Sequence, residues 1–178
     1  MKTQKGKDRL VYQGHIKLVK RPYGGKDYDV IVSKNAAIIL YIDEKDMVYF
    51  VKQFRPAIGK EVLSLAAETL DKPGLSPLEV IVEGLEEECG IRIKKEQVES
   101  HGYLYSSEGH DSEKVYLFSA RGKGEYVSQK LGEFEKIKVI KIPFYKAFQM
   151  AMKNQIHGAK TTQLLMYEFL RRHNSKEK

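Results

Sequence analysis

The chain is organised around one helix-forming stretch, SPLEVIVEGLEEECGI, which covers residues 76–91. Ser76 is placed to cap the helix, Pro77 suits its first turn, and Glu79 follows the serine by three residues, which is the spacing of a capping box. Apolar side chains follow at helical spacing, and Gly90 is a natural C-terminal stop. The stretch therefore predicts a capped amphipathic helix that ends at Gly90.

Strand-like and helix-like segments surround this helix and predict a mixed α/β domain. Strands are expected before it at 10–12, 15–19, 28–33, 36–41 and 48–53. Strands are expected after it at 100–105, 115–120 and 137–142, followed by helices at 144–154 and 160–172. No internal repeat or low-complexity tract interrupts this order.

The positive charge of the chain is concentrated at its two ends. The 178 residues carry a formal net charge of +7, of which residues 1–21 contribute +6 and residues 171–178 contribute +3, so the remainder carries −2. A nucleic-acid groove needs basic residues on the folded body. Nucleic-acid binding is therefore an alternative that rests on the terminal charges alone.

Cysteine content and hydropathy indicate a protein of a reducing compartment. Cys89 is the single cysteine, and it cannot form an internal disulfide. The longest apolar run, residues 36–42, is far too short to span a bilayer. We therefore expect a cytoplasmic protein with no membrane partner.

The central helix carries an unusual density of glutamates. Glu83, Glu86, Glu87 and Glu88 lie within six residues, with Glu79 one turn earlier. Like charges four residues apart destabilise a helix unless a cation lies between them. Carboxylate oxygens of this kind suit Mg²⁺ or Mn²⁺ bound together with substrate phosphates. The alternative is that these glutamates only form the solvated face of the helix.

The stretch from 51 to 91 resembles the Nudix hydrolase family, whose box is Gly-x5-Glu-x7-Arg-Glu-U-x-Glu-Glu-x-Gly-U, with U aliphatic. The second half of that box is filled by Leu85, Glu87, Glu88, Gly90 and Ile91. Residues 51–56, 69–74 and 158–161 resemble segments of the ADP-ribose pyrophosphatase subgroup. The resemblance covers residues 10 to 172 and implies a Nudix α/β/α sandwich around a mixed sheet, with an N-terminal antiparallel β extension.

The resemblance and the composition together divide the chain into four parts. The resemblance implies a β extension at 10–34 and a Nudix domain at 35–172, and the basic, polar composition of the two ends predicts flexible tails at 1–9 and 173–178. The extension and the segment 158–161, which leads into a long apolar helix, look like the dimer-forming parts of the subgroup. A homodimer is therefore expected, and the alternative is that both segments contribute to the core of one chain.

Four positions depart from the family box. Glu68 stands where the box begins with Gly, Leu75 replaces the first Glu, Glu83 replaces the Arg, and Gly84 replaces a metal-binding Glu. Adjacent helical residues point about 100° apart, so Glu83 lines up with Glu87 and cannot replace the ligand missing at 84. The box is therefore degenerate, and the positions that depart from it are largely those that the family uses for catalysis.

The resemblance still implies a reduced metal site. Glu88 would be the principal ligand of Mg²⁺ or Mn²⁺, Glu87 an auxiliary ligand, and Ala67 would contribute its backbone carbonyl. The ligand would be a nucleoside diphosphate derivative such as ADP-ribose, which would be hydrolysed to AMP and ribose 5-phosphate.

The remaining site residues are also implied by the resemblance. Arg55 matches an arginine that contacts the substrate diphosphate, and Glu113 or Glu133 matches the catalytic glutamate of a later loop. Arg55 could equally be a surface charge and Glu133 a solvated loop residue. His110 and His157 could serve as acid–base groups, although lone loop histidines are usually polar surface.

Two functions follow from this sequence. The first is metal-dependent hydrolysis of ADP-ribose or another nucleoside diphosphate sugar, attenuated by the degenerate box. The second is a nucleotide-binding or regulatory Nudix domain without turnover, which a nucleotide sugar would stabilise without being cleaved.

Overall fold

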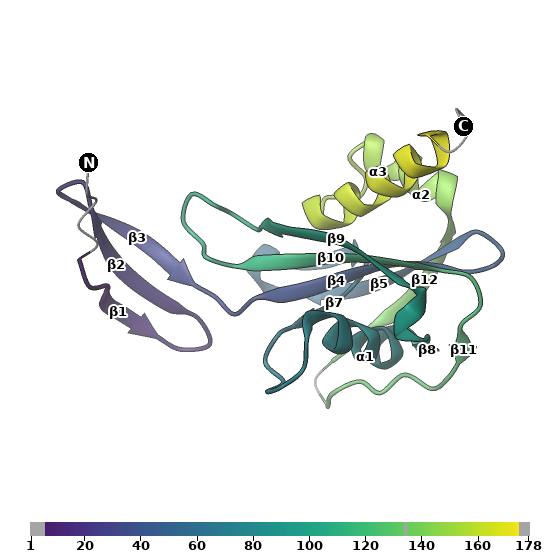
Figure 1. Cartoon of the computed structure of the whole chain (residues 1–178), viewed down its shortest axis with the longest axis horizontal. Coiled ribbons are helices and arrows are strands. Elements are labelled where there is room, and N and C mark those ends of the chain that lie inside the picture. Colours follow the sequence, from purple (N-terminus) through teal and green to yellow (C-terminus); the bar gives the residue numbers. More distant parts are fainter. Residues whose placement is uncertain (1–5, 134, 175–178) are drawn as a thin grey trace.

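The computed structural model of the chain describes residues 6–133 and 135–174. Its main body has three layers (Figure 1). Helix α1 (Pro77–Cys89) covers one face of a seven-stranded sheet, while α2 (Phe144–Met152) and α3 (Ala159–Asn174) cover the other. The expected mixed α/β architecture is confirmed.

The seven strands form a mixed sheet. The main path is β12 (Lys138–Pro143), β5 (Met47–Arg55), β4 (Ala36–Ile42), β10 (Lys114–Arg121) and β9 (Val98–Tyr105). The short strands β6 (Lys60–Ser64) and β7 (Ala66–Thr69) pair with β5 and β4, respectively. Strand β4 runs parallel to β10, and the other pairings are antiparallel.

Strand β4 supplies both hydrophobic cores because its side chains alternate between the two faces. Ile38 and Leu40 pack toward α2 and α3, whereas Ile39 and Tyr41 pack toward α1. A strand covered on both faces reads as a continuous apolar run, which is what residues 36–42 show. This strand fixes the position of α1 relative to α3.

Helix α1 begins and ends as its sequence predicts. The Ser76 hydroxyl accepts a hydrogen bond from the Glu79 amide at 3.3 Å, and the Glu79 carboxylate accepts one from the Ser76 amide at 2.8 Å. Gly90 adopts a left-handed conformation with φ of 64° and closes the helix. Both ends are therefore fixed by local chemistry.

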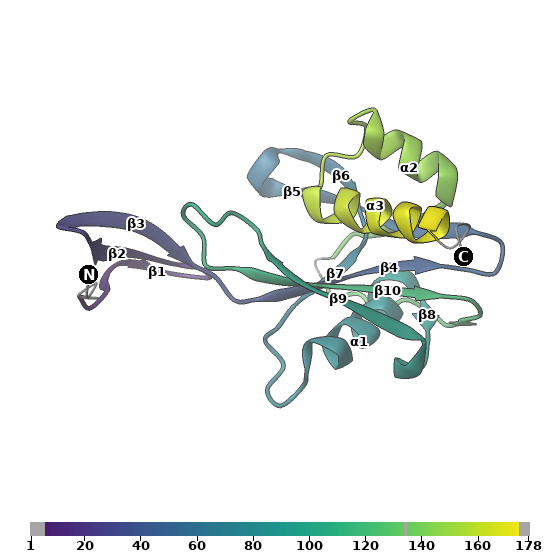
Figure 2. The same cartoon turned by 45° about the horizontal axis from the view of Figure 1, so that its top comes forward.

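A three-stranded antiparallel sheet projects from the main body (Figures 1 and 2). It consists of β1 (Arg9–Gln13), β2 (Lys17–Tyr23) and β3 (Lys26–Val32). A parallel bridge joins Ile31 to Asp111, next to the hydrogen bond that the Ile31 amide donates to the His110 carbonyl at 2.7 Å. The large exposed apolar side chains of this three-stranded sheet and its turns include Leu10, Val11, Tyr12, Ile16, Tyr23 and Tyr28.

Several short elements complete the fold. They are β8 (Ile91–Arg92), which pairs with β11 (Glu125–Tyr126), and two 3₁₀ turns, Pro56–Ile58 and Lys95–Gln97. None of the helices formed by the described residues combines the length and apolar character needed to cross a bilayer.

The boundaries differ most at β2, which runs from Lys17 to Tyr23 where a strand at 15–19 was expected, and by smaller amounts at the helices and termini. Helix α2 ends at Met152, two residues before the expected 154, and α3 continues to Asn174, past the expected 172. Strand β1 already begins at Arg9, within the expected N-terminal tail. Residues 1–5 and 175–178 of the two expected tails lie outside the described residues.

Candidate functional site

A cavity of about 340 Å³ lies where β7, the end of β5 and the start of α3 meet. Its polar lining residues are Arg55, Ser64, Glu68, Thr69, Glu113, Lys160 and Thr161, and Ala67 also lines it. The structure thus brings together three residues expected at the site: Arg55, Ala67 and Glu113. The cavity combines positive and negative side chains, as a site for a phosphate with a cation requires.

Glu88 lies beside this cavity and is the glutamate of α1 that turns inward. Its residue surface is 6% exposed, and its Oε2 accepts a hydrogen bond from the Ala67 amide at 3.1 Å. Burial, and then the charge of Glu68, raise the pKa of Glu88 to about 8, although the Ala67 bond and Arg55 act in the opposite direction. A neighbouring cation would stabilise the charged form of this carboxyl.

Glu68 was noted in the sequence only as a departure from the box, but the structure places it between the cavity and α1. It lines the cavity, and burial, followed by the charge of Glu87, raises its pKa to about 7. A Cβ atom added to Gly84 would lie 2.1 Å from Cγ of Glu68. The Glu68 side chain therefore occupies the space that a side chain at position 84 would need.

Glu87 does not face the cavity as an unpaired ligand. Lys72 places its Nζ 3.1 Å from Oε1 of Glu87 and 2.9 Å from Oε2 of Glu83. This lysine is the cation expected between the two like charges, which lie four residues apart. The auxiliary metal role expected for Glu87 would require it to leave or share this ion pair.

The outer glutamates of α1 match the solvated-face alternative. Glu86 lies 2.8 Å from both Arg92 and Lys130, and Glu79 lies 2.7 Å from Lys95. These pairs are on the surface and add little to stability individually. The two faces of the acidic helix therefore differ, because the outer glutamates are charge-paired while Glu88 is buried beside the cavity.

Two cations and a second carboxylate line the cavity together with Glu68. Arg55 ends β5, and Lys160 lies in the first turn of α3. The Nζ of Lys160 is 3.6 Å from Oε2 of Glu113, which precedes β10. Arg55 and Lys160 can contact phosphate oxygens from two directions, and Lys160 was not among the residues expected from the sequence.

Glu133 lies exposed in the loop after β11 and does not line the cavity. Burial is the main cause of the raised pKa of Glu68 and of Glu88, and the charge of Glu135 in this loop adds a smaller contribution to both. Oε2 of Glu135 accepts a hydrogen bond from the Gly132 amide at 3.0 Å. The loop is fastened to the end of α1, because Gln129 donates to the Glu88 carbonyl at 2.5 Å.

The donor set fits a cation that is shared with a ligand. Within 6–133 and 135–174, no three His, Cys, Asp or Glu side chains are grouped closely enough to hold a metal ion. Mg²⁺ commonly uses one or two carboxylates and takes its other ligands from water and substrate phosphates. Glu68 and Glu88 can supply such a pair, and Ser64 in the cavity wall has a buried Oγ without a hydrogen-bond partner.

The two histidines considered from the sequence lie elsewhere. His110 is in the loop before β10, with its ring nitrogens 3.3 and 3.4 Å from the Ser107 hydroxyl. His157 lines a different surface depression beside the start of α3. Neither side chain lines the cavity that contains Arg55 and Glu68.

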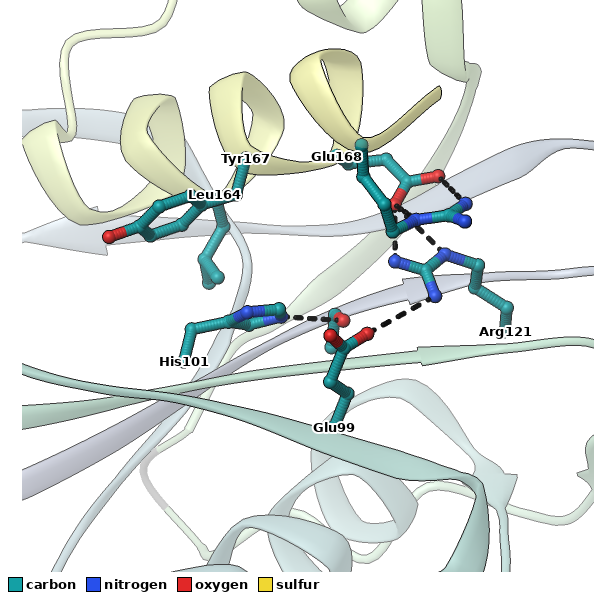
Figure 3. Close-up of a pocket in the computed structure, with 8 residues that line it drawn as sticks. Glu99, His101, Arg121, Leu164, Tyr167 and Glu168 are labelled. Carbon is teal, nitrogen blue, oxygen red and sulfur yellow. Dashed lines mark hydrogen bonds and ion pairs between the residues drawn. The ribbon is translucent and has the colours of Figure 1, made fainter. Parts of the chain in front are cut away.

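A second cavity, of about 150 Å³, lies between β9, β10 and α3 (Figure 3). Glu168, 2% exposed, binds Arg121, Arg171 and Arg172 there. His101 lies 2.8 Å from the Ser119 hydroxyl and stacks on Tyr167. Arg121 also pairs with Glu99, and Arg172 also pairs with Asp46. Three carboxylates therefore balance the three guanidinium groups, and the network holds α3 on the sheet with little charge left for a ligand.

Known proteins resemble this chain along most of its length. The GDP-mannose pyrophosphatase of Salmonella arizonae is 31% identical over 150 residues, which cover 74% of this chain and 71% of that protein. The GDP-mannose pyrophosphatase of Cronobacter sakazakii is 28% identical over 93% of this chain and 94% of its own. The ADP-ribose pyrophosphatase of Bacillus subtilis is 24% identical over 86% of this chain and 82% of its own. None of the protein-family models compared with the chain matches it.

Proposed function

This chain belongs to the Nudix-type pyrophosphatase family that includes GDP-mannose pyrophosphatase, and we propose that it hydrolyses the diphosphate bond of a nucleoside diphosphate sugar. One observation supports this function above all. Arg55 and Lys160 line the same cavity as Glu68, which lies beside the buried Glu88. The diphosphate would lie between these cations and the carboxylate pair.

Each residue at the site would have a limited task. Arg55 would bind the diphosphate from the end of β5, and Lys160 would bind it from α3. Glu88 would hold Mg²⁺ or Mn²⁺ with help from Glu87 and the Ala67 carbonyl. The bound ion would neutralise charge that develops on the phosphate oxygens.

The reaction would be attack of water on one phosphorus of the diphosphate. A P–O bond forms to the water oxygen, the bridging P–O bond breaks, and the bridging oxygen leaves on the other phosphate. Glu113 or Glu133 would accept the water proton as general base. ADP-ribose would give AMP and ribose 5-phosphate, and GDP-mannose would give GMP and mannose 1-phosphate.

A second candidate is binding of a nucleotide sugar without turnover. The ion pair between Lys72 and Glu87 favours it, because a ligand engaged with lysine is less available to a metal. Gly84 also leaves α1 without a carboxylate at that position. Such a domain would keep the diphosphate contacts of Arg55 and Lys160 and would have little activity.

Product release and ligand binding separate the two candidates. We would measure AMP and GMP release from ADP-ribose and GDP-mannose with Mg²⁺, with Mn²⁺ and with EDTA. Hydrolysis should require the cation, and Glu88→Gln should slow it by about 100-fold, which corresponds to about 2.7 kcal/mol of lost transition-state stabilisation. Glu96→Gln, at an exposed residue away from the site, should leave the rate unchanged.

A rise in melting temperature with the nucleotide sugar but no product would instead support the binding domain. If no substrate gave either product or a thermal shift, both candidates would be contradicted.

We further propose that the chain forms a homodimer through its N-terminal sheet. That sheet projects from the body and exposes Leu10, Val11 and Tyr12, whose apolar surface a second copy could cover. Sedimentation velocity should give a dimer for the wild type and a monomer for Val11→Lys/Tyr12→Asp. Tyr145→Asp, at an exposed residue of α2, is the control and should remain dimeric. A monomeric wild type would contradict the proposal.

A further inference from the structure

Position 84 on α1 and position 68 on β7 are in direct steric competition. A Cβ atom at Gly84 would lie 2.1 Å from Cγ of Glu68 and 3.0 Å from its Cδ and Oε1. Carbon atoms of neighbouring side chains normally approach to about 3.5–4.0 Å. The present position of the Glu68 side chain therefore depends on the absence of a side chain at position 84.

The close approach fixes where the Glu68 carboxylate lies. Strand β7 packs against α1, and the residue preceding Glu68, Ala67, donates its amide hydrogen to the Glu88 carboxylate at 3.1 Å. Glu68 also lines the cavity that contains Arg55 and Lys160. Glu68 thus shares a cavity wall with Arg55 and Lys160, and it directly follows the residue whose amide binds the inward-facing Glu88.

These two positions have opposite residues in the family box, with Gly at position 68 and Glu at position 84. In this chain the glutamate is on the strand and the glycine is on the helix. We propose that the exchange is functional, and that Glu68 supplies from β7 the carboxylate missing at Gly84 and holds, together with Glu88, the cation of a bound diphosphate. The inference rests on the proposed function, since it adds a residue to the same site.

A cation bound by only two carboxylates needs further ligands from the substrate. The buried, unpartnered Oγ of Ser64 lies in the wall of the same cavity, but it is a neutral ligand at best. The free protein should therefore bind Mn²⁺ weakly, and a diphosphate should strengthen Mn²⁺ binding while Mn²⁺ strengthens diphosphate binding by the same factor.

Mn²⁺ binding measures this role without relying on turnover. The free Mn²⁺ signal in electron paramagnetic resonance would be titrated with the protein, with and without the α,β-methylene analogue of ADP-ribose, which cannot be hydrolysed. In the presence of the analogue, Glu68→Gln should weaken Mn²⁺ binding by about tenfold or more, as Glu88→Gln should. Glu86→Gln, whose carboxylate pairs with Arg92 and Lys130 on the outer face of α1, is the matched control and should change the affinity by less than about twofold.

An unchanged Mn²⁺ affinity in Glu68→Gln, with a loss in Glu88→Gln, would overturn the inference and leave the proposed function standing. A wild-type protein that binds neither Mn²⁺ nor the analogue would overturn both.

The steric exchange has its own test by thermal unfolding. Gly84→Ala should lower the melting temperature of the wild type, because the new Cβ displaces Glu68. In the Glu68→Gly background the same change should raise it, because alanine favours a helix more than glycine does. The double variant Glu68→Gly/Gly84→Glu should retain Mn²⁺ binding in the presence of the analogue. If Gly84→Ala changed the melting temperature equally in both backgrounds, the proposed steric competition between positions 68 and 84 would be wrong.

Discussion

The backbone amide of Ala67 donates a hydrogen bond to Oε2 of Glu88 at 3.1 Å, and this bond joins strand β7 to helix α1 at the site. The other glutamates of α1 pair with lysine or arginine on the surface; they are Glu79, Glu83, Glu86 and Glu87. Glu88 is held inward beside the cavity instead. Its burial raises the pKa of its carboxyl to about 8.

Stability without metal should fall as the pH rises toward 8. Glu88 and Glu68 have pKa values of about 8 and 7 in the folded protein, above their ordinary value of 4.5, so between pH 4.5 and 8 the folded state keeps protons that the unfolded state releases. The free energy of unfolding therefore decreases across that range.

Glu88→Gln removes one of these groups. Its melting temperature relative to wild type should rise from pH 5 to pH 8.5 in EDTA, as calorimetry would measure. Glu96→Gln should show no such trend. A constant difference between Glu88→Gln and the wild type would contradict the assignment.

The charge network behind α3 predicts the opposite pH dependence. Burial would raise the pKa of Glu168, but hydrogen bonds from Arg171, Arg121 and Arg172 lower it to about 2. This stabilisation is present above pH 4.5 and is lost as the pH falls toward 2.

Glu168→Gln should cost about 1.5–3 kcal/mol at pH 7, measured by urea unfolding, because it removes the buried carboxylate that Arg121, Arg171 and Arg172 share. The cost should shrink below pH 4. Glu99→Gln is the control, since its exposed pair with Arg121 should contribute less than about 1 kcal/mol. If both variants lost the same free energy of unfolding at pH 7, the buried network would stabilise the protein no more than a surface ion pair does.

The N-terminus of α1 should depend on its capping serine. Ser76→Ala removes the acceptor for the Glu79 amide and should destabilise the protein by about 1 kcal/mol in chemical denaturation. Ser76→Asp keeps an acceptor at that position and should be close to wild type. Equal losses in both variants would assign the effect to something other than the cap.

Gly90 should be far less tolerant of alanine than Gly74. Both have positive φ, 64° and 81°, so both variants carry the conformational cost of about 1–2 kcal/mol. An added Cβ at Gly90 would also lie 2.5 Å from the Val127 carbonyl oxygen, whereas at Gly74 it would meet nothing within 4 Å. Gly90→Ala should therefore lower the melting temperature more than Gly74→Ala does, and the difference measures the effect of that clash. An equal fall in both variants would contradict the prediction.

The sequence predicts the main elements because each has a strong local signal. Strand β4 is apolar on both faces, and α1 has a capping box and a C-terminal glycine. Strands β6 and β7 were missed because each is short, and β7 is rich in alanine, which has a weak strand preference. These strands nevertheless carry Ser64, Ala67 and Glu68 to the site.

Most of the residues matched singly to the family pattern lie in one region of the structure, and the roles given to them stay predictions. Arg55, Ala67 and Glu113 indeed line one cavity, and Glu88 lies beside it. Glu68 was missed because its role arises from a contact between β7 and α1, which no local pattern contains. Its only signal was that a glutamate at 68 accompanies a glycine at 84, two departures that the structure brings into contact.

Phosphorus NMR of ADP-ribose and of GDP-mannose, each mixed with the protein and Mg²⁺, tests the central claim most directly. We predict that the wild type replaces the diphosphate resonances of at least one compound with two phosphomonoester resonances, and that Glu88→Gln does so far more slowly. Diphosphate resonances that persist with the wild type, or that disappear equally fast with Glu88→Gln, would contradict hydrolysis at this site.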